Sequence, residues 1–316
     1  MHILITGGAG FLGQRLAKQL LLNPDVTRLI LADLYLPPTP GNDRRVQPVQ
    51  ADLTDSSAVQ SLITPEISVV YHLAAIVSGQ AEADFDLGMR VNCDGTRHLL
   101  EAVRHQVPGA IFIFASSLAV FGGELPAVIT PDTVVKPQSS YGTQKAISEL
   151  WVNDYTRKGF IDGRVLRLPT VCVRPGKPNA AASSFASGII REPLAGEQAI
   201  CPVELSLPLW LSGPSTVVDN LIHALTLTPE QFSDTRTLNL PGLTITVQAM
   251  IDALGEVAGV QALKQIQYEP DEKISRIVAS WPSEFEVERA IALGFKRDRT
   301  FQDIIRAHIH DTQSLT

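Results

Sequence analysis

Tyr141 and Lys145 stand four residues apart in the segment Tyr-Gly-Thr-Gln-Lys, a spacing that suits acid–base chemistry. Residues at i and i+4 lie one turn apart on the same face of a helix. Lowering the pKa of a tyrosine from about 10 by about three units requires about 4 kcal/mol. An ammonium group about 5 Å away supplies about 3 kcal/mol at an effective dielectric constant of about 20. We therefore predict that Lys145 helps Tyr141 to exchange a proton, although ordinary exposed helix pairs show the same spacing.

Ser116 and Ser117 follow the apolar run Ile111–Ala115, which predicts a strand buried on both faces. Ligands of doubly wound parallel sheets bind at the carboxyl ends of the strands. Ser117 is thus predicted to hydrogen-bond the reacting oxygen, with a turn or helix cap as the alternative role. Asn92 is predicted either to order a water in a proton relay or to be a buried asparagine in helix packing.

A glycine-rich string, Thr6-Gly-Gly-Ala-Gly-Phe-Leu-Gly13, follows a predicted strand and opens a predicted helix. In that position glycines let backbone N–H groups approach a pyrophosphate at the positive end of the helix. Two spacings fit the string, with either Gly7 or Gly8 as the first glycine before Gly10 and Gly13. The alternative is a tight strand–helix turn without a ligand.

Asp33 ends the second predicted strand, twenty residues after Gly13. A carboxylate there accepts hydrogen bonds from both ribose hydroxyls of an adenosine and repels a 2′-phosphate. No basic residue follows Asp33 before Arg44, so NAD is favoured over NADP. Asp52 is a candidate contact to the adenine ring, or alternatively the cap of a helix starting near Asp55.

Short β-branched runs alternate with helical patterns in the first half of the chain, which predicts βαβ units and a parallel sheet. The predicted strands are residues 2–6, 29–33, 46–50, 69–73, 111–115 and 164–168. The predicted helices are residues 14–22 and 83–103 and one beginning near residue 141. We expect an α/β fold, in which a Rossmann-like doubly wound parallel sheet is joined to a smaller α+β substrate domain. Residues 1–169, with a return segment at about 207–240, are assigned to the first domain, and residues 170–206 and 241–316 to the second.

Composition excludes several classes of protein. The chain has 316 residues, of which 26 are basic and 33 acidic, and this net charge of −7 argues against a nucleic-acid partner. Three widely spaced cysteines without a C-x-x-C motif suggest neither disulfides nor a zinc site. We expect no metal, with His72 in the core and His308 and His310 in solvent. No apolar run approaches the ~20 residues of a membrane span, and no export signal is evident, so a cytoplasmic location is expected.

Taken together, these motifs resemble the extended short-chain dehydrogenase/reductase family, also described as NAD-dependent epimerases/dehydratases. The motifs that carry the resemblance are the glycine string, Asp33, Asp52-Leu53, His72-Leu-Ala-Ala75, Asn92, Ser117, Tyr141 and Lys145. The implied NAD contacts are Gly7, Gly10, Phe11, Leu12, Gly13, Asp33, Asp52, Leu53, Leu73, Ala74, Ala75, Asn92, Tyr141, Lys145, Pro169 and Val171. The implied catalytic residues are Ser117, Tyr141, Lys145 and Asn92. Family members place the serine four residues before the aromatic of a Val-Tyr-Gly triplet, and Val120-Phe121-Gly122 departs from that pattern only at Phe121.

The substrate must be inferred from residues that vary among such enzymes. Residues 169–193 supply small residues, hydroxyls and two arginines, with Phe185 as the one aromatic side chain for stacking on a base. This composition suits a small polyhydroxy acid better than a nucleotide sugar, and Arg174 or Arg191 would clamp its carboxylate unless it is a surface salt-bridging arginine. Ser78 and Asn179 would face the same substrate, together with Ser117 and Tyr141.

The strings at 74–90, 138–141 and 277–282 resemble the members of that family that oxidise small sugar acids. The resemblance implies oxidation of the C2 hydroxyl of D-erythronate to 2-oxo-tetronate, in the catabolism of four-carbon sugar acids. The alternatives are a uronate dehydrogenase, a nucleotide-sugar epimerase or dehydratase, and a non-catalytic NAD-sensing module. The family's usual habit also implies a homodimer formed through helices of the main domain.

Overall fold

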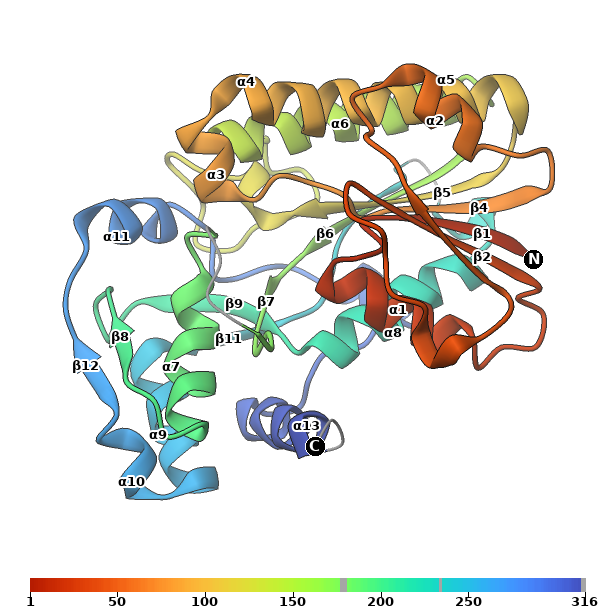
Figure 1. The fold of residues 1–316 in the computed structure, drawn as a ribbon. Helices are drawn as coiled ribbons and strands as arrows, with labels where there is room; N and C mark the ends of the chain where they lie inside the picture. The colour runs from red at the N-terminus through yellow and green to blue at the C-terminus, as the bar shows by residue number, and fades with distance from the viewer. Residues whose placement is uncertain (177–180, 233–234, 314–316) are drawn as a thin grey trace.

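A seven-stranded sheet forms the centre of the computed structural model, which describes residues 1–176, 181–232 and 235–313. Its order is β10-β6-β5-β4-β1-β2-β3, and all neighbouring strands are parallel (Figure 1). The strands are β1 (His2–Thr6), β2 (Arg28–Asp33), β3 (Val46–Gln50), β4 (Ile67–His72), β5 (Ile111–Ser117), β6 (Asp162–Leu168) and β10 (Thr237–Asn239). Because the order runs outward from β1 in both directions, the sheet is doubly wound, with its crevice at the carboxyl ends of β1 and β4. The predicted fold class is confirmed.

Helices cover both faces of this sheet (Figure 1). One layer contains α1 (Phe11–Leu20) and α8 (Pro214–Thr226), and the other contains α2 (Ser56–Leu62), α5 (Gly95–Gln106) and α6 (Ser140–Arg157). Side chains of β1 alternate between the layers, since Ile3 and Ile5 join the core under α1 and α8 while Leu4 joins the core under α5 and α6.

The region predicted as one helix over residues 83–103 is helical, but it consists of consecutive elements of different type. They are α3 (Ser78–Ala83), α4 (Phe85–Gly88), a π-helix over Met89–Asp94 and α5. The Asp84 carboxylate accepts the Leu87 N–H and caps α4, so the chain restarts its helix at that point. At the other helix edges the predictions differ by fewer residues, for example at α1, which begins at Phe11 rather than at residue 14.

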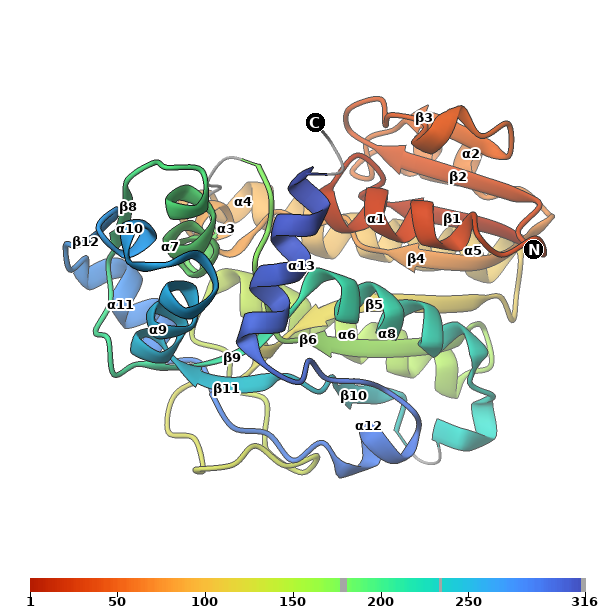
Figure 2. The same ribbon diagram turned by 90° about the horizontal axis from the view of Figure 1, so that it is seen from below.

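A second part of the chain carries two small sheets around its own core (Figure 2). The first has the order β11-β9-β7, and the second pairs β12 with β8. These strands are β7 (Thr170–Val171), β8 (Ala199–Cys201), β9 (Pro208–Ser212), β11 (Leu243–Thr246) and β12 (Ile266–Tyr268). The helices here are α7 (Ser184–Leu194), α9 (Val247–Ala258), α10 (Val260–Leu263), α11 (Glu272–Ala279) and α13 (Phe301–Gln313). Helix α12 (Glu288–Ala292) instead packs on the core of the main sheet through Ala290. Of the expected return segment, α8 and β10 join the main sheet, whereas β9 belongs to the small one.

One buried histidine and three short helices complete the description of the fold. His308 is buried in α13, contrary to the expectation that it is solvated. Short 3-10 helices span Pro40–Asn42, Leu118–Val120 and Pro229–Phe232. No helix in the described ranges is both long and apolar enough to cross a membrane.

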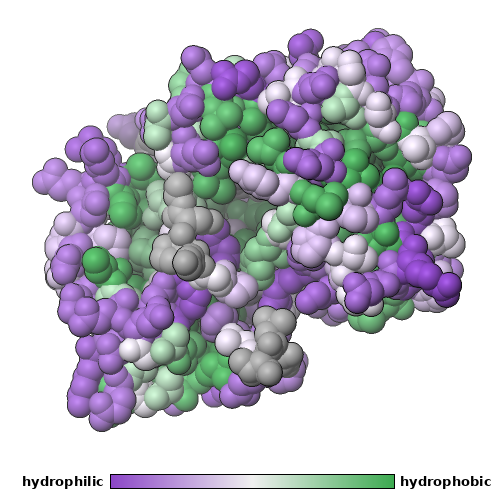
Figure 3. Space-filling model, in the orientation of Figure 1, coloured by the Kyte–Doolittle hydropathy of each residue, from purple (hydrophilic) through white to green (hydrophobic). Residues whose placement is uncertain are grey.

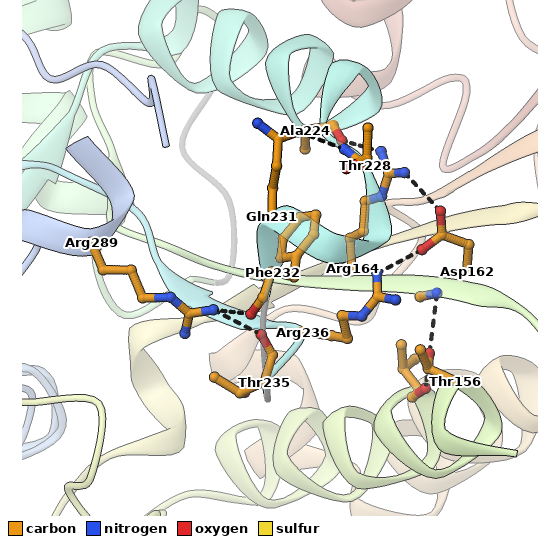
Figure 4. Close-up of polar contacts among 12 residues, drawn as sticks. Thr156, Asp162, Arg164, Ala224, Thr228, Gln231, Phe232, Thr235, Arg236 and Arg289 are labelled. Carbon is orange, nitrogen blue, oxygen red and sulfur yellow. Dashed lines mark hydrogen bonds and ion pairs between the residues drawn. The ribbon is translucent and has the colours of Figure 1, made fainter. Parts of the chain in front are cut away.

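Two arginines, the buried Arg164 and the partly buried Arg236, join the return segment to the main sheet (Figure 4). Arg164 of β6 is 1% exposed, and it pairs with Asp162 at 2.8 Å and donates to the Ala224 carbonyl of α8. Arg236, which precedes β10, pairs with the other oxygen of Asp162 at 2.7 Å. Both guanidinium groups lie over the Phe232 ring. One carboxylate therefore forms ion pairs with two arginines from separate segments.

Asp162→Ala should lower the free energy of unfolding by about 3 kcal/mol, because the buried Arg164 would lose its counter-charge. Urea denaturation measures this. Asp154 pairs with Arg157 at the surface, so Asp154→Ala is the matched control and should change stability little. Equal effects of the two substitutions would contradict this account of the arginine cluster.

Candidate active site

A cavity of about 370 Å³ opens at the carboxyl ends of the central strands, and it extends to residues of the second part. The molecular surface is hollowed at this place (Figure 3). The predicted site residues that line the cavity are Gly7, Gly10, Phe11, Leu12, Gly13, Leu73, Ala75, Ser78, Ser117, Tyr141, Lys145, Pro169, Val171 and Arg174. Residues far apart in sequence thus meet at the place where a doubly wound sheet binds ligands.

The glycine loop between β1 and α1 has no room for side chains. Gly7 has φ +75°, and a Cβ on it would lie 2.8 Å from the Ala74 nitrogen. A Cβ on Gly13 would lie 2.2 Å from the Gly7 carbonyl oxygen. The loop therefore brings bare backbone and the first N–H groups of α1 to the cavity, an arrangement that fits the pyrophosphate of a dinucleotide.

Asp33 closes this loop from the end of β2. One of its carboxylate oxygens accepts the Ala9 N–H at 3.0 Å, which holds the glycine loop against the strand. Asp52 accepts the Thr54 N–H at 2.8 Å in a tight turn. The alternative role of Asp52 as a helix cap is wrong, because Asp55 itself caps α2. Adenosine contacts of Asp33, Asp52 and the buried Leu53 stay predictions.

Lys145 is anchored at the centre of the site. Its ammonium donates to the Ala115 carbonyl of β5 at 2.8 Å and lies 4.6 Å from the Phe114 ring centroid. Burial lowers the pKa of Lys145 to about 8, although the Glu149 carboxylate one turn further along α6 opposes this. Lys145 thus joins the catalytic helix to the sheet.

Tyr141, the other member of the predicted pair, has a raised pKa. Burial raises its pKa to about 12, and the interaction with the Ser117 hydroxyl and the charge of Arg174 offset only part of this rise. The Lys145 ammonium is 5.8 Å from the ring centroid of Tyr141 and is directed to a backbone carbonyl. In the protein without a cofactor, desolvation of the phenol outweighs the favourable charges around it. That Lys145 and an oxidised nicotinamide together lower the pKa of Tyr141 stays a prediction.

The two serines at the end of β5 have separate partners. Strand β5 extends through both of them, since they pair with Arg167 and Leu168 of β6. Ser117 accepts the Ala119 N–H at 3.1 Å and also lines the cavity, so the cap and the predicted substrate contact are compatible. Ser116 donates to Glu149, which in turn forms an ion pair with Arg167 at 2.7 Å.

Asn92 does not line the cavity, and its polar groups are engaged. The side-chain amide accepts the Ile76 N–H at 2.8 Å and donates to Ile76 O at 3.0 Å and to Gln144 Oε1 at 2.7 Å. The backbone carbonyl of Asn92 accepts the Thr96 hydroxyl at 2.6 Å and the Ser148 hydroxyl at 3.2 Å. These bonds support the alternative of a buried packing asparagine, and the water relay through Asn92 stays a prediction.

The predicted substrate residues separate into two groups. Arg174 lines the cavity, and its charge acts on Tyr141. Arg191 is absent from the described lining, and it donates to the Arg174 carbonyl at 2.7 Å and pairs with Glu192. Ser78 lines the cavity and accepts the Ala182 N–H at 3.2 Å. Asn179 lies outside the described residues.

The cavity lining also includes residues that the sequence analysis did not assign one by one, although it placed Ser116 at this sheet edge and residues 169–193 near the substrate. They are Val77, Ala115, Ser116, Leu118, Ala119, Leu168, Thr170, Ala181, Ser183 and Trp281. Most of them adjoin predicted strands or motif residues, so their closeness in sequence to those residues was a signal for their place in the cavity. Trp281 follows α11, and nothing in its local sequence indicates that it reaches a cavity beside Tyr141.

The profile of the NAD dependent epimerase/dehydratase family matches residues 3–217. This chain belongs to that family. It is 53% identical to a D-erythronate dehydrogenase of Haemophilus influenzae, over 98% of this chain and 99% of the relative. A D-erythronate dehydrogenase of Cupriavidus necator is 51% identical, over 98% of each chain. A solved structure described as a nucleoside-diphosphate-sugar epimerase from Agrobacterium tumefaciens is 43% identical, with a TM-score of 0.94 over 99% of this chain and 95% of that one.

The family's cofactor is NAD, and the bare glycine loop with Asp33 beside it fits a dinucleotide. Within residues 1–176, 181–232 and 235–313, no group of three His, Cys, Asp or Glu side chains is placed to hold a metal ion.

The raised pKa of Tyr141 predicts a stability change at high pH. Between about pH 10, where an unfolded tyrosine titrates, and about pH 12, the folded protein binds more protons than the unfolded chain. The contribution of this group to stability is therefore lost as the pH rises through that window.

Tyrosinate absorbance at 295 nm, taken as wild type minus Tyr141→Phe, should show one group that stays protonated at pH 10. Saturating NAD should lower its midpoint, since the oxidised nicotinamide carries a positive charge. Tyr35→Phe, which removes a 74% exposed tyrosine, controls for the number of tyrosines. A midpoint at or below pH 10 for the protein alone would refute the assigned burial effect.

Proposed function

We propose that this protein is an NAD-dependent dehydrogenase that oxidises the C2 hydroxyl of D-erythronate to 2-oxo-tetronate. The observation that carries the proposal is the presence of Arg174 in the same cavity as Tyr141, close enough for its charge to act on the phenol. In a 2-hydroxy acid the carboxylate is bonded to the reacting carbon, so the site needs a cation beside the catalytic hydroxyl. The two relatives that match this chain over 98% of its length at 53% and 51% identity carry the same activity in their names.

Each residue of the cavity has a role in this reaction. Ser117 holds the C2 hydroxyl oxygen, and Tyr141 accepts its proton. Arg174 binds the carboxylate and thereby orients C2. Lys145, held by the Ala115 carbonyl, binds the nicotinamide ribose. Bound NAD supplies the hydride acceptor.

The remaining proposed contacts concern the dinucleotide. The glycine loop takes the pyrophosphate, and Asp33, Asp52 and Leu53 take the adenosine. Leu73, Ala74, Ala75, Pro169 and Val171 enclose the rest of the cofactor. Ser78 and Asn179 are proposed for the substrate hydroxyls. Arg191 is proposed to position Arg174 by donating a hydrogen bond to the Arg174 carbonyl, and not to bind substrate itself.

Incubation of the pure protein with NAD and C4 to C6 aldonates tests the proposed activity. NADH absorbance should appear with D-erythronate above all other acids tested. Activity only on a cyclic uronic acid would identify a uronate dehydrogenase. Turnover of a nucleotide sugar without net NADH would identify an epimerase. NAD binding without any turnover would indicate a sensing module.

Arg174→Met should raise the KM for the acid by about tenfold to a hundredfold, because a charged hydrogen-bonding partner is worth about 1.5–3 kcal/mol. The Kd for NAD, measured by calorimetry, should change less than twofold. The exposed Arg276 of α11 supplies the matched control, and Arg276→Met should alter neither constant. Equal weakening of NAD and acid by Arg174→Met would count against a carboxylate clamp.

We also propose that the protein is a homodimer in the cytoplasm. Apolar side chains are exposed on the helical layer formed by α4, α5 and α6, with Phe85 59% and Leu150 71% exposed. Three free buried cysteines are compatible with a reducing compartment. The mass in solution tests the dimer.

A further inference from the structure

A chain of hydrogen bonds crosses the core beneath the site, and the reaction scheme does not use it. Thr6 Oγ1 lies 2.7 Å from His72 Nδ1, and His72 Nε2 lies 2.8 Å from Thr96 Oγ1. The Thr96 hydroxyl then donates to the Asn92 carbonyl at 2.6 Å. All four residues are at most 3% exposed. Such a polar chain is stable in a core only when each member is satisfied, and here each hydroxyl and ring nitrogen has a partner.

The direction of every bond follows from the last one. Since the Thr96 hydroxyl proton goes to Asn92, the Thr96 oxygen receives a proton from His72 Nε2. Burial, together with the positive charge of Lys145, lowers the pKa of His72 to about 3, so the imidazole is neutral. Nδ1 is then unprotonated and accepts the Thr6 hydroxyl. The protein therefore selects one tautomer of His72.

The two ends of the chain reach the two halves of the site. Thr6 directly precedes Gly7 of the phosphate loop. At the other end, the Asn92 side chain binds both backbone groups of Ile76 and the side chain of Gln144. Gln144 stands on α6 directly before Lys145. The His72 ring also contacts the Phe114 ring on which the Lys145 ammonium lies.

We propose that His72 and Thr96 are positioning residues, which hold the phosphate loop of β1 and the catalytic helix α6 at one fixed separation. Hydride transfer requires that the nicotinamide and C2 of the substrate be positioned with a tolerance of less than about 1 Å, because small misplacements lower the rate by large factors. Because each bond in this chain has a fixed donor and a fixed acceptor, the chain favours one spacing between the residues at its two ends. This inference rests on the proposed function of the same site.

Thr96→Val and Thr96→Ser test the proposal as a matched pair, because valine keeps the shape and serine keeps the hydroxyl. Thr96→Val should lower kcat per folded molecule by about tenfold, with the KM for the acid and the calorimetric Kd for NAD within about twofold of wild type. Thr96→Ser should restore kcat to near the wild-type value. Thr6→Val and Thr6→Ser provide a second pair at the other end should Thr96→Val fold poorly.

NMR of nitrogen-labelled His72 supplies a readout independent of turnover. It should show a single neutral form with the proton on Nε2 from pH 5 to 8, and Thr96→Val should remove this preference. A lower melting temperature with unchanged kcat per folded molecule would reduce the chain to core packing and overturn the proposal. Equal losses in the valine and serine variants, or titration of His72 between pH 5 and 8, would also overturn it. If the wild-type protein were inactive on every acid, the proposed function would be refuted instead. The NMR measurement would then still show whether the hydrogen-bond chain selects one tautomer of His72.

Discussion

The organisation of the site depends on one buried ammonium group. Lys145 is fully enclosed, and it donates to the carbonyl of Ala115 near the end of β5. Burying a charge without a partner is costly, so the Ala115 carbonyl, the Phe114 ring and the Glu149 carboxylate together define where α6 rests on the sheet. Because Tyr141 is one turn away on the same helix, the position of Lys145 also places the phenol.

Burial holds Tyr141 and Lys145 in place, but it also disfavours the charged form of each side chain. Tyr141 ionises less readily than a free tyrosine, and Lys145 keeps its proton less readily than a free lysine. A neutral phenol beside an ammonium with a lowered pKa is the lower-energy state of the protein alone. Positive charge added next to the phenol would favour its ionised form, so the proposed proton acceptance by Tyr141 depends on a complex that supplies such charge. This coupling ties proton transfer to cofactor binding.

The second part of the chain determines what else enters the cavity. Arg174 follows β7, and its backbone carbonyl accepts a hydrogen bond from Arg191 of α7, so this helix holds the proposed carboxylate-binding residue in place. Trp281, from the C-terminal region, lines the cavity. It packs against the core of the second part and against a small apolar cluster that contains Phe121, Trp210 and Phe285. Arg174 and Trp281 thus add a cation and an aromatic ring of the second part to the cavity that the glycine loop and β5 begin.

Local patterns in the sequence determined the strands, the glycine loop and the Tyr141–Lys145 pair, because period, turn chemistry and i to i+4 spacing are properties of neighbouring residues. A lone residue such as Asp33 was predictable because it ends a strand beside that loop. Tertiary structure alone decided that Asp55 rather than Asp52 caps α2, that Arg174 rather than Arg191 lines the cavity, and that Trp281 joins it. The pKa of Tyr141 also belongs to this group, since desolvation depends on every atom packed around the ring, and these atoms come from segments far apart in the chain.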